Sequence, residues 1–235
     1  MILNNDYYWF KSALTDDQCD EIILRGEREM SLAQERGESL EATTFGGKDK
    51  ASMFESGLGE DDPVSQGTKT NQAVKKEKGD TFIRDTHVSG LGDEEIYSWI
   101  HPYLAEANSA AGWNFEWDWS EVLQFTKYNQ HQFYGWHSDA SPNPYSPEVG
   151  NPNYVGKIRK LSMTVNLSDP KDYKGGNLRF DFGPHAEKSR YHTCTEIRPR
   201  GSIIVFPSDR LHQVTPITSG LRYSLVMWSL GQPWK

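Results

Sequence analysis

Three side chains that bind metal ions stand in two segments far apart in the sequence. His137 and Asp139 belong to the run Trp136-His137-Ser138-Asp139, and His212 follows Leu211 much later in the chain. Two imidazoles and one carboxylate form the facial ligand set that holds a non-haem ferrous ion and leaves neighbouring coordination positions open. This donor set predicts a catalytic metal site rather than a structural one.

The spacing of the first two ligands has a mechanical reason. Residues i and i+2 of an extended strand point to the same face, so His137 and Asp139 can reach one ion while Ser138 points away. His212 must then complete the site from a distant strand. We therefore expect two strands, remote in sequence, to meet at the metal.

A basic residue follows the third ligand in a run that predicts a buried strand. Arg222 opens the segment Arg222-Tyr223-Ser224-Leu225-Val226-Met227-Trp228, which is rich in apolar and aromatic residues. Strand alternation puts Arg222, Ser224, Val226 and Trp228 on one face. An unpaired buried charge is costly, and the guanidinium fork suits a carboxylate in bidentate geometry. We expect a dicarboxylate cosubstrate to be the partner of Arg222.

Composition excludes several functional classes. The net charge of -8 argues against a nucleic-acid backbone as the main ligand. Cys19 and Cys194 are the only cysteines, too few for a disulfide framework or a Cys-rich zinc site. No stretch approaches the ~20 apolar residues of a membrane span, and the first residues lack the features of a secretory signal. We expect a cytoplasmic protein, since a reducing compartment also suits a ferrous ion.

The chain length of 235 residues predicts a single domain. Within it, we expect residues 1–118 to form an N-terminal helical support and residues 119–231 to form a β-rich core. Residues from about 38 to 80 are mostly Gly, Ser, Thr, Lys, Asp and Glu. Such a composition cannot bury enough apolar surface to order itself, so it predicts a polar, flexible insertion.

Local signals predict two helices. Thr15 and Gln18 form a capping box before a helix over 16–36, which should end near Gly37. A second helix over 93–110 carries an apolar stripe. Pro102 lies inside this segment, so the sequence allows a kink or a break there. Strands are predicted at 7–10, 81–88, 122–128, 161–167, 178–182, 196–199, 202–206 and 222–229.

Alternation within one of these strands indicates how the layers are arranged. Leu161, Met163 and Val165 alternate with Ser162 and Thr164, so the strand should turn an apolar face to the helices and a polar face to a cavity. The predicted architecture is α+β and mainly β, a double-stranded β-helix (jelly roll) core backed by the N-terminal helices.

The ligand set, together with the segments around it, resembles the 2-oxoglutarate- and Fe(II)-dependent oxygenases. Within them, the chain is similar to the prolyl 4-hydroxylase branch, which includes the bacterial PKHD-type hydroxylases. The similarity extends to residues 14–23, 161–170, 172–178, 206–208 and 211–217. It covers most of the chain except the polar insertion.

The resemblance implies a role for each candidate residue. Iron would be bound by His137, Asp139 and His212, and Arg222 would pair with the distal carboxylate of 2-oxoglutarate. Three further residues would contribute to the cosubstrate pocket, namely Tyr128, Asn166 and Trp228. Asn166 stands where some animal relatives have a second tyrosine, so this contact departs from the family pattern.

The resemblance also implies the reaction. Dioxygen and 2-oxoglutarate would be converted to succinate and carbon dioxide while a peptidyl residue, first of all proline, is hydroxylated, with ascorbate as a candidate reductant. A protein or peptide would be the substrate, and the oligomeric state stays open. The same chemistry on a free amino acid or on a nucleic-acid alkyl group is an alternative. Demethylases of nucleic acids carry a further arginine where this chain has Trp228.

A non-catalytic jelly-roll module is the alternative from another class. A silent relative would have lost a metal ligand, and none is missing here. A cupin would need a His-x-His pair and a following Glu, which the segment around His137 does not supply.

Overall fold

Two helices and two main antiparallel sheets make up the part of the chain that this computed structural model describes, residues 5–42, 84–141, 143–184 and 189–234. The helices are α1 (Asp16–Glu35) and α4 (Glu94–Ala110), with a 3-10 turn η2 (Pro147–Val149). The strands are β1 (Tyr8–Phe10), β2 (Arg84–Asp85), β3 (His87–Leu91), β4 (Trp119–Ser120), β5 (Leu123–Tyr128), β6 (Phe133–His137), β7 (Ile158–Asn166), β8 (Tyr173–Gly175), β9 (Leu178–Asp181), β10 (Tyr191–Thr193), β11 (Ile203–Pro207), β12 (Leu211–Val214), β13 (Ile217–Gly220) and β14 (Arg222–Gly231).

The two helices begin and end where their local sequence signals placed them. At α1, the Thr15 hydroxyl accepts from the backbone N–H of Gln18, and the Gln18 side chain accepts from the backbone N–H of Thr15. Gly37, with φ of +75°, follows the end of this helix. Asp93 caps α4, and that helix runs through Pro102 without a break. The capping box and both helices are therefore confirmed.

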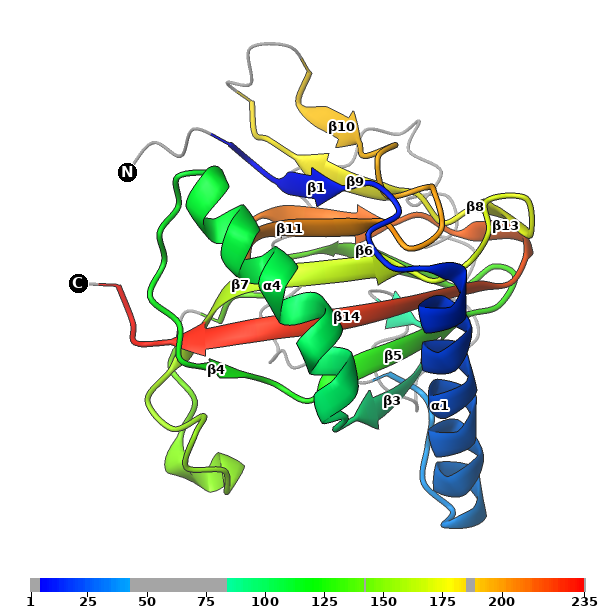
Figure 1. The fold of residues 1–235 in the computed structure, drawn as a ribbon, viewed down its shortest axis with the longest axis horizontal. Helices are drawn as coiled ribbons and strands as arrows, with labels where there is room; N and C mark the ends of the chain where they lie inside the picture. The colour runs from blue at the N-terminus through cyan, green and yellow to red at the C-terminus, as the bar shows by residue number, and fades with distance from the viewer. Residues whose placement is uncertain (1–4, 43–83, 142, 185–188, 235) are drawn as a thin grey trace, which may run out of the picture.

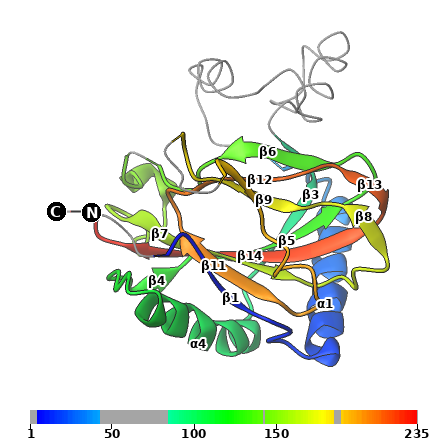
Figure 2. The same ribbon diagram turned by 90° about the horizontal axis from the view of Figure 1, so that it is seen from above.

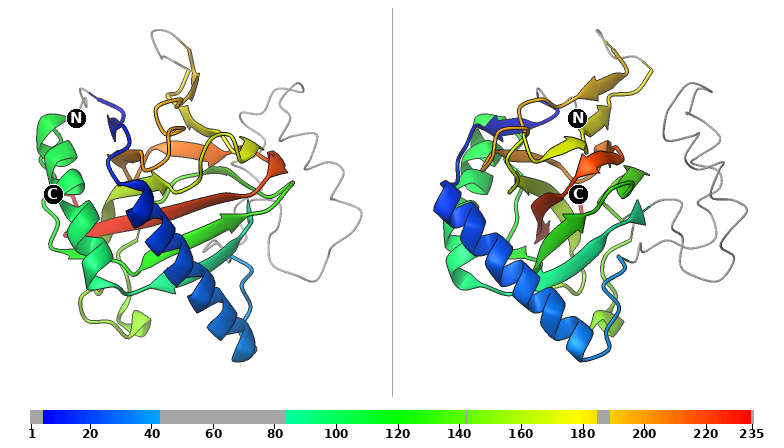
Figure 3. Two further views of the ribbon diagram at one scale, coloured as in Figure 1. Left: turned by 45° about the vertical axis from the view of Figure 1, so that its right-hand side comes forward. Right: turned by 90° about the vertical axis from the view of Figure 1, so that its right-hand side faces the viewer.

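The sheets stack as two layers of a jelly roll. The larger sheet has the strand order β1-β11-β7-β14-β5-β3, with β4 paired to β14, and the smaller sheet has the order β10-β9-β12-β6-β2. Both helices cover one face of the larger sheet, and the smaller sheet faces its other side (Figures 1 and 2). Figure 3 shows α1 and α4 on that same face from two further sides. The predicted fold class is confirmed.

The main core lies between the larger sheet and the helices. Leu161, Met163 and Val165 of β7 pack there together with Ile22 of α1 and Ile100 of α4. The alternate residues of β7, Ser162 and Thr164, point to the other side, into the space between the sheets. The predicted division of this strand into an apolar and a polar face is therefore confirmed.

Several predicted strands differ from the structure. The strand predicted at 196–199 is wrong, because this segment forms turns closed by hydrogen bonds from Arg198 N–H to the Thr195 carbonyl and from Ser202 N–H to the Pro199 carbonyl. The segment predicted as one strand at 81–88 divides between the sheets, with β2 in the smaller and β3 in the larger. The predicted flexible insertion lies outside the described residues from position 43 onward.

The first 118 residues also contribute strands, because β1 and β3 join the larger sheet and β2 joins the smaller one. Among the described residues, neither helix carries a stretch with the length and hydropathy needed to cross a membrane.

Candidate active site

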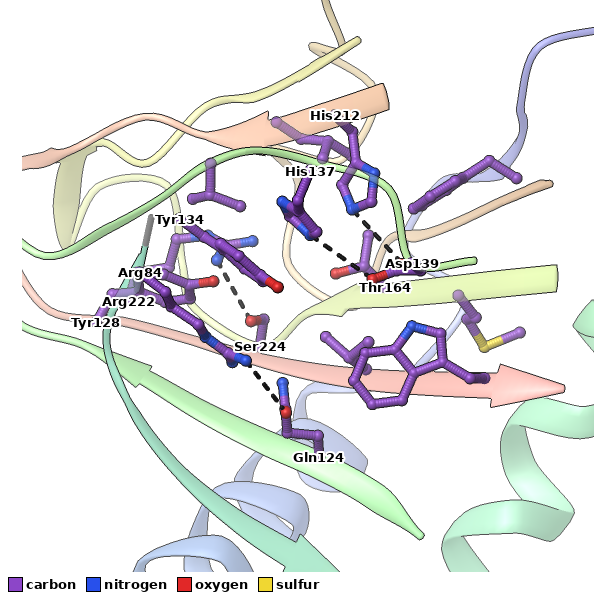
Figure 4. A pocket seen from close by; sticks show the side chains of 16 residues that line it. Arg84, Gln124, Tyr128, Tyr134, His137, Asp139, Thr164, His212, Arg222 and Ser224 are labelled. Carbon is purple, nitrogen blue, oxygen red and sulfur yellow. Dashed lines mark hydrogen bonds and ion pairs between the residues drawn. The ribbon is translucent and has the colours of Figure 1, made fainter. Parts of the chain in front are cut away.

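The two sheets enclose a pocket of about 500 Å³, its open mouth included. Apolar residues, among them Leu178 and Val226, make up part of its wall, and Figure 4 shows the side chains that line it. The polar and aromatic lining residues are Arg84, Gln124, Tyr128, Tyr134, His137, Asp139, Thr164, His212, Arg222, Ser224 and Trp228. All the residues predicted to bind metal or cosubstrate line this pocket except Asn166.

Strand pairing brings the two histidines together. β12 pairs with β6 in a register that puts His212 opposite His137, and both imidazoles point into the pocket (Figure 4). Asp139 lies two residues beyond the end of β6, where the N–H of Ala140 donates to the Ser208 carbonyl at 2.8 Å. The ligand atoms of His137, Asp139 and His212 all lie within 4.8 Å of one another.

Hydrogen bonds to the backbone determine which imidazole nitrogen faces the cluster. Nδ1 of His137 lies 2.7 Å from the Gly135 carbonyl, and Nδ1 of His212 lies 2.9 Å from the Arg210 carbonyl. A carbonyl oxygen can only accept, so each Nδ1 carries a proton, and Nε2 is the nitrogen of each ring that is left to bind a metal. Each Nε2 lies 3.6 Å from an oxygen of Asp139.

Electrostatics keep these donors in the protonation states that metal binding needs. Burial, reinforced by the neighbouring His212, lowers the pKa of His137 well below its usual value, so this imidazole is neutral at pH 7. Burial alone would raise the pKa of Asp139, but His212, His137 and Arg159 outweigh it and bring the pKa to about 2. The cluster therefore offers a neutral imidazole at His137 and a carboxylate at Asp139, with Nε2 of His212 directed at the same centre.

The carboxylate of Asp139 is also held from the larger sheet. Its Oδ2 accepts a hydrogen bond of 2.7 Å from the Ser162 hydroxyl, which lies 3.0 Å from the Ser208 hydroxyl. Such bonds behind a ligand fix its orientation. By donor type, protonation and orientation, the three residues fit a ferrous ion.

Arg222 is a buried cation with no anionic partner in the described residues. Its residue exposure is 2%, its Nη1 donates at 3.3 Å to the Ser224 hydroxyl, and its Nε donates to no described atom. Among the described residues, no carboxylate oxygen lies within 4 Å of the guanidinium. A Cβ on Gly176 would approach Cδ of Arg222 to 3.0 Å, so this glycine leaves room for the side chain. The environment fits a bound carboxylate.

The other predicted pocket residues occupy different surroundings. Tyr128 pairs with Arg222 across β5 and β14, and the guanidinium carbon lies 5.2 Å from the centre of its ring. Trp228 lines the pocket beneath the guanidinium of Arg159, which lies 3.8 Å from its ring centre. Asn166 instead donates to the carbonyls of Ser168 and Arg198, away from the pocket lining. Its role in cosubstrate binding stays a prediction.

The loop after the ligands is tied to the protein by a buried carboxylate. Glu121 accepts from Arg159 at 2.6 and 2.7 Å and from the Tyr145 hydroxyl at 2.7 Å. Tyr145 and Tyr154 also pack together, with ring centres 5.5 Å apart. These aromatic residues of the loop therefore support the loop itself.

Tyr134 and Arg84 are among the pocket residues that were not identified from the sequence. The Tyr134 ring stacks on the His137 imidazole, with ring centres 3.4 Å apart and planes at 9°. Arg84 places its guanidinium carbon 4.5 Å from the centre of the same ring (Figure 4). Tyr134 and His137 are three positions apart, which simple alternation would put on opposite faces. A register shift opposite His212 and Val214 lets both face the pocket.

The remaining described histidines lie outside the cluster. His131 is exposed, while His87, His101 and His192 contact Asn129, Ser120 and Tyr7. These four histidines are therefore either solvent-facing or hydrogen-bonded within the fold. His185 lies outside the described residues.

Comparison with known proteins agrees with this geometry. Residues 123–230, from β5 into β14, match the family model described as the 2OG-Fe(II) oxygenase superfamily. The PKHD-type hydroxylase YbiX of Shigella boydii is 35% identical over 106 residues, which are 44% of this chain and 40% of that protein. The chain thus spans about 40% of the length of the curated relatives that it matches.

Two solved structures share the fold across nearly the whole chain. A viral collagen prolyl hydroxylase from Paramecium Bursaria Chlorella virus-1 superposes with a TM-score of 0.56 at 15% identity, covering 97% of both chains. A prolyl hydroxylase from Trichoplax adhaerens, in complex with a hypoxia inducible factor peptide fragment, gives a TM-score of 0.58 at 13% identity. The latter comparison covers 96% of this chain and 83% of that one.

A jelly roll that carries a His-x-Asp pair and a distant His has the metal-ligand set of the non-haem Fe(II) oxygenases. By this match, residues 123–230 belong to the 2OG-Fe(II) oxygenase superfamily, and His137, Asp139 and His212 all lie within them.

Proposed function

We propose that this protein is a 2-oxoglutarate- and Fe(II)-dependent dioxygenase that hydroxylates a peptidyl residue, with proline the first candidate. One observation carries the proposal. The three metal-binding side chains and the unpaired guanidinium of Arg222 line the same pocket. A metal site alone would fit many proteins, whereas a metal site beside an unpaired buried cation fits a ligand that chelates the metal and carries a second, anionic end.

Each residue has a defined part in this proposal. His137, Asp139 and His212 hold Fe(II), and Arg222 holds the distal carboxylate of 2-oxoglutarate beside the Tyr128 ring. When bound, iron and 2-oxoglutarate supply oxidative decarboxylation, in which dioxygen converts the cosubstrate to succinate and carbon dioxide and one oxygen atom enters the substrate. Ascorbate is the reductant that we would add to keep the iron ferrous.

The chain itself provides positioning and exclusion of water. The protonated Nδ1 atoms of His137 and His212 keep the Nε2 lone pairs directed at the metal. Ser162 holds Asp139, and Leu178 and Val226 form part of the apolar wall. An enclosed site confines a reactive oxidant to the substrate.

The proposed substrate class rests on relatives rather than on contacts seen here. Relatives at 35% identity over part of the chain are PKHD-type hydroxylases, and neighbours in fold are prolyl hydroxylases, one with a peptide bound. We further propose that residues 1–118 and 119–231 act as one catalytic unit, since β1, β2 and β3 complete both sheets. A reducing compartment such as the cytosol suits the ferrous ion.

The first test is chelation and uncoupled turnover. Fe(II) and 2-oxoglutarate, mixed with the protein without oxygen, should produce a visible absorption band of the chelate, and oxygen should then release succinate. His212→Ala should lose both signals, because two donors cannot replace the facial set. His131→Asn, at an exposed histidine outside the cluster, is the matched control and should retain both. A fully active His212→Ala protein would show that the ligand assignment is wrong.

A further inference from the structure

The pocket contains a second arginine that the reaction just proposed does not use. Arg84 of β2 is 6% exposed and lines the pocket from the smaller sheet, whereas Arg222 belongs to β14 of the larger sheet. Its Nε donates at 3.0 Å to the Thr86 hydroxyl, and its Nη1 lies at the outer limit of hydrogen bonding, 3.5 Å, from Oε1 of Gln124. Both partners are neutral.

No described residue neutralises the charge of Arg84. Within the described residues, no carboxylate oxygen lies within 4 Å of its guanidinium, and the neighbouring Asp85 accepts a hydrogen bond from Gln132. The Tyr134 ring beneath the guanidinium stabilises a cation but does not neutralise it. The contrast with Arg159 is clear, because that arginine forms a two-point ion pair with Glu121.

When each charge in the pocket with metal and cosubstrate bound is paired with an opposite charge, the Arg84 cation has no partner. Under the proposed function, the distal carboxylate of the cosubstrate balances Arg222. Asp139 and the proximal carboxylate balance the divalent metal. Asp139 is the one carboxylate among the described residues that line the pocket, so none is left for Arg84. A nearly buried cation without a counter-charge favours an anionic ligand.

We propose that Arg84 binds a carboxylate of the primary substrate, so that the enzyme selects substrates with a carboxylate close to the carbon that is oxidised. This proposal rests on the proposed function. The Tyr134 ring separates Arg84 from the His137 imidazole (Figure 4). A group bound at Arg84 therefore lies one aromatic ring away from a metal ligand. The carboxylate can belong to an acidic side chain next to the target residue, or to the free end of a peptide or amino acid.

The test uses matched pairs of short peptides, each with one proline and a blocked N-terminus, and the peptides of the first pair also have a blocked C-terminus. One pair carries Glu or Gln beside the proline, and a second pair ends in proline as the free acid or as the amide. Binding to the protein loaded with Fe(II) and 2-oxoglutarate is measured without oxygen by calorimetry, and succinate release above the substrate-free rate is measured with oxygen. The two pairs distinguish a side-chain carboxylate from a terminal one.

We expect the carboxylate member of at least one pair to bind about 10- to 100-fold more tightly than its neutral partner, as hydrogen bonds to a charged group predict. Arg84→Gln should abolish this preference, and Arg84→Lys should retain part of it. Arg190→Gln, at an arginine paired with Asp181 outside the pocket, should leave the preference unchanged. If the parent protein does not prefer the acid in either pair, the proposal is wrong.

The cosubstrate provides the second criterion. Arg84→Gln should bind 2-oxoglutarate nearly as tightly as the parent, as judged from titration of the chelate band. A loss as large as that of an Arg222 variant would assign Arg84 to the cosubstrate and overturn the proposal. The parent protein distinguishes this failure from that of the function itself, because a protein with no chelate band and no succinate release is not a dioxygenase at all.

Discussion

Two arginines close to the metal ligands differ in whether their charge is satisfied. Arg159 forms two hydrogen bonds with Glu121 and lies on the Trp228 ring, so its charge is already neutralised. Arg222 is more deeply buried, donates to the Ser224 hydroxyl and lies near the Tyr128 ring, and no carboxylate of the described residues pairs with it. A structural arginine and a ligand-binding arginine can thus be distinguished by counting carboxylates rather than by burial.

Replacing Arg222 should therefore weaken cosubstrate binding rather than the fold. Arg222→Gln removes the charge and should lower the affinity for 2-oxoglutarate about 10- to 100-fold, while Arg222→Lys should lose less. Anaerobic titration of the chelate band gives both affinities. Arg36→Gln, at an exposed arginine paired with Glu38, serves as the control. Equal affinities for the parent and Arg222→Gln would remove Arg222 from the cosubstrate site.

At the residue scale, the sequence predicted those site residues whose type carries the chemistry. His137, Asp139, His212 and Arg222 were identifiable because imidazoles, a carboxylate and a guanidinium at these spacings are informative by themselves. Arg84 could not be identified in this way, since its significance depends on the absence of a nearby carboxylate. The position of Tyr134 in the pocket depends on a register shift in the pairing of β6 with β12, and no residue type indicates such a shift.

Among the elements, α1 meets the larger sheet through a glycine. A Cβ built on Gly26 would lie 2.3 Å from Cγ of Phe125, whose side chain is fully buried in β5. The helix can approach the sheet this closely because position 26 has no side chain. Gly26 is therefore a packing residue, although a glycine inside a helix is ordinarily unfavourable.

Gly26→Ala is consequently expected to destabilise the protein, against the trend of helix propensity. Alanine should stabilise the helix itself by roughly 1 kcal/mol, but the overlap with Phe125 should cost more, for a net loss of about 1–3 kcal/mol. Urea unfolding measures the difference. Gln34→Ala, at an exposed position of the same helix, is the control for helix propensity. A stabilised Gly26→Ala protein would mean that the ring of Phe125 moves aside easily.

At the element scale, local signals explain why the helices were predicted better than the strands. Thr15, Gln18 and Asp93 cap their helices through contacts within a few residues, so the sequence alone determines these ends. Short strands such as β8 and β10 exist only because a partner strand lies beside them. Their three residues carry too little pattern to reveal a partner that is distant in the sequence.

At the scale of the whole molecule, a polar contact joins α1 to the larger sheet. Glu27 accepts hydrogen bonds of 2.7 Å from Lys127 of β5 and from the Tyr223 hydroxyl of β14. Burial would raise the pKa of the Glu27 carboxyl, but these two bonds outweigh it and the pKa falls below its usual value. The folded protein therefore binds this proton less tightly than the unfolded chain does.

This link should make the fold sensitive to acid. Its stabilisation is fully present above the ordinary carboxyl pKa of about 4.3 and disappears as the pH falls through the lowered pKa of the folded state. Glu27→Gln should lower the free energy of unfolding by about 0.5–1 kcal/mol at pH 7, allowing for partial exposure. The difference from the parent should shrink in acid. Denaturant unfolding at several pH values measures it, with the exposed Glu35→Gln as control. If the difference in the free energy of unfolding did not change with pH, the lowered pKa would not belong to Glu27.

The two anchor points of the cosubstrate belong to different layers of the fold. The imidazoles at positions 137 and 212 are carried by the smaller sheet, and the guanidinium at position 222 by the larger one. Under the proposed function, one flexible dicarboxylate must contact both sheets, so the spacing between the two layers selects the length of the cosubstrate. Once decarboxylated, the same molecule has become one carbon shorter and has lost its keto group. It can no longer chelate the metal while its other end reaches the larger sheet. Binding of the product is therefore weaker, which favours its release at the end of each catalytic cycle.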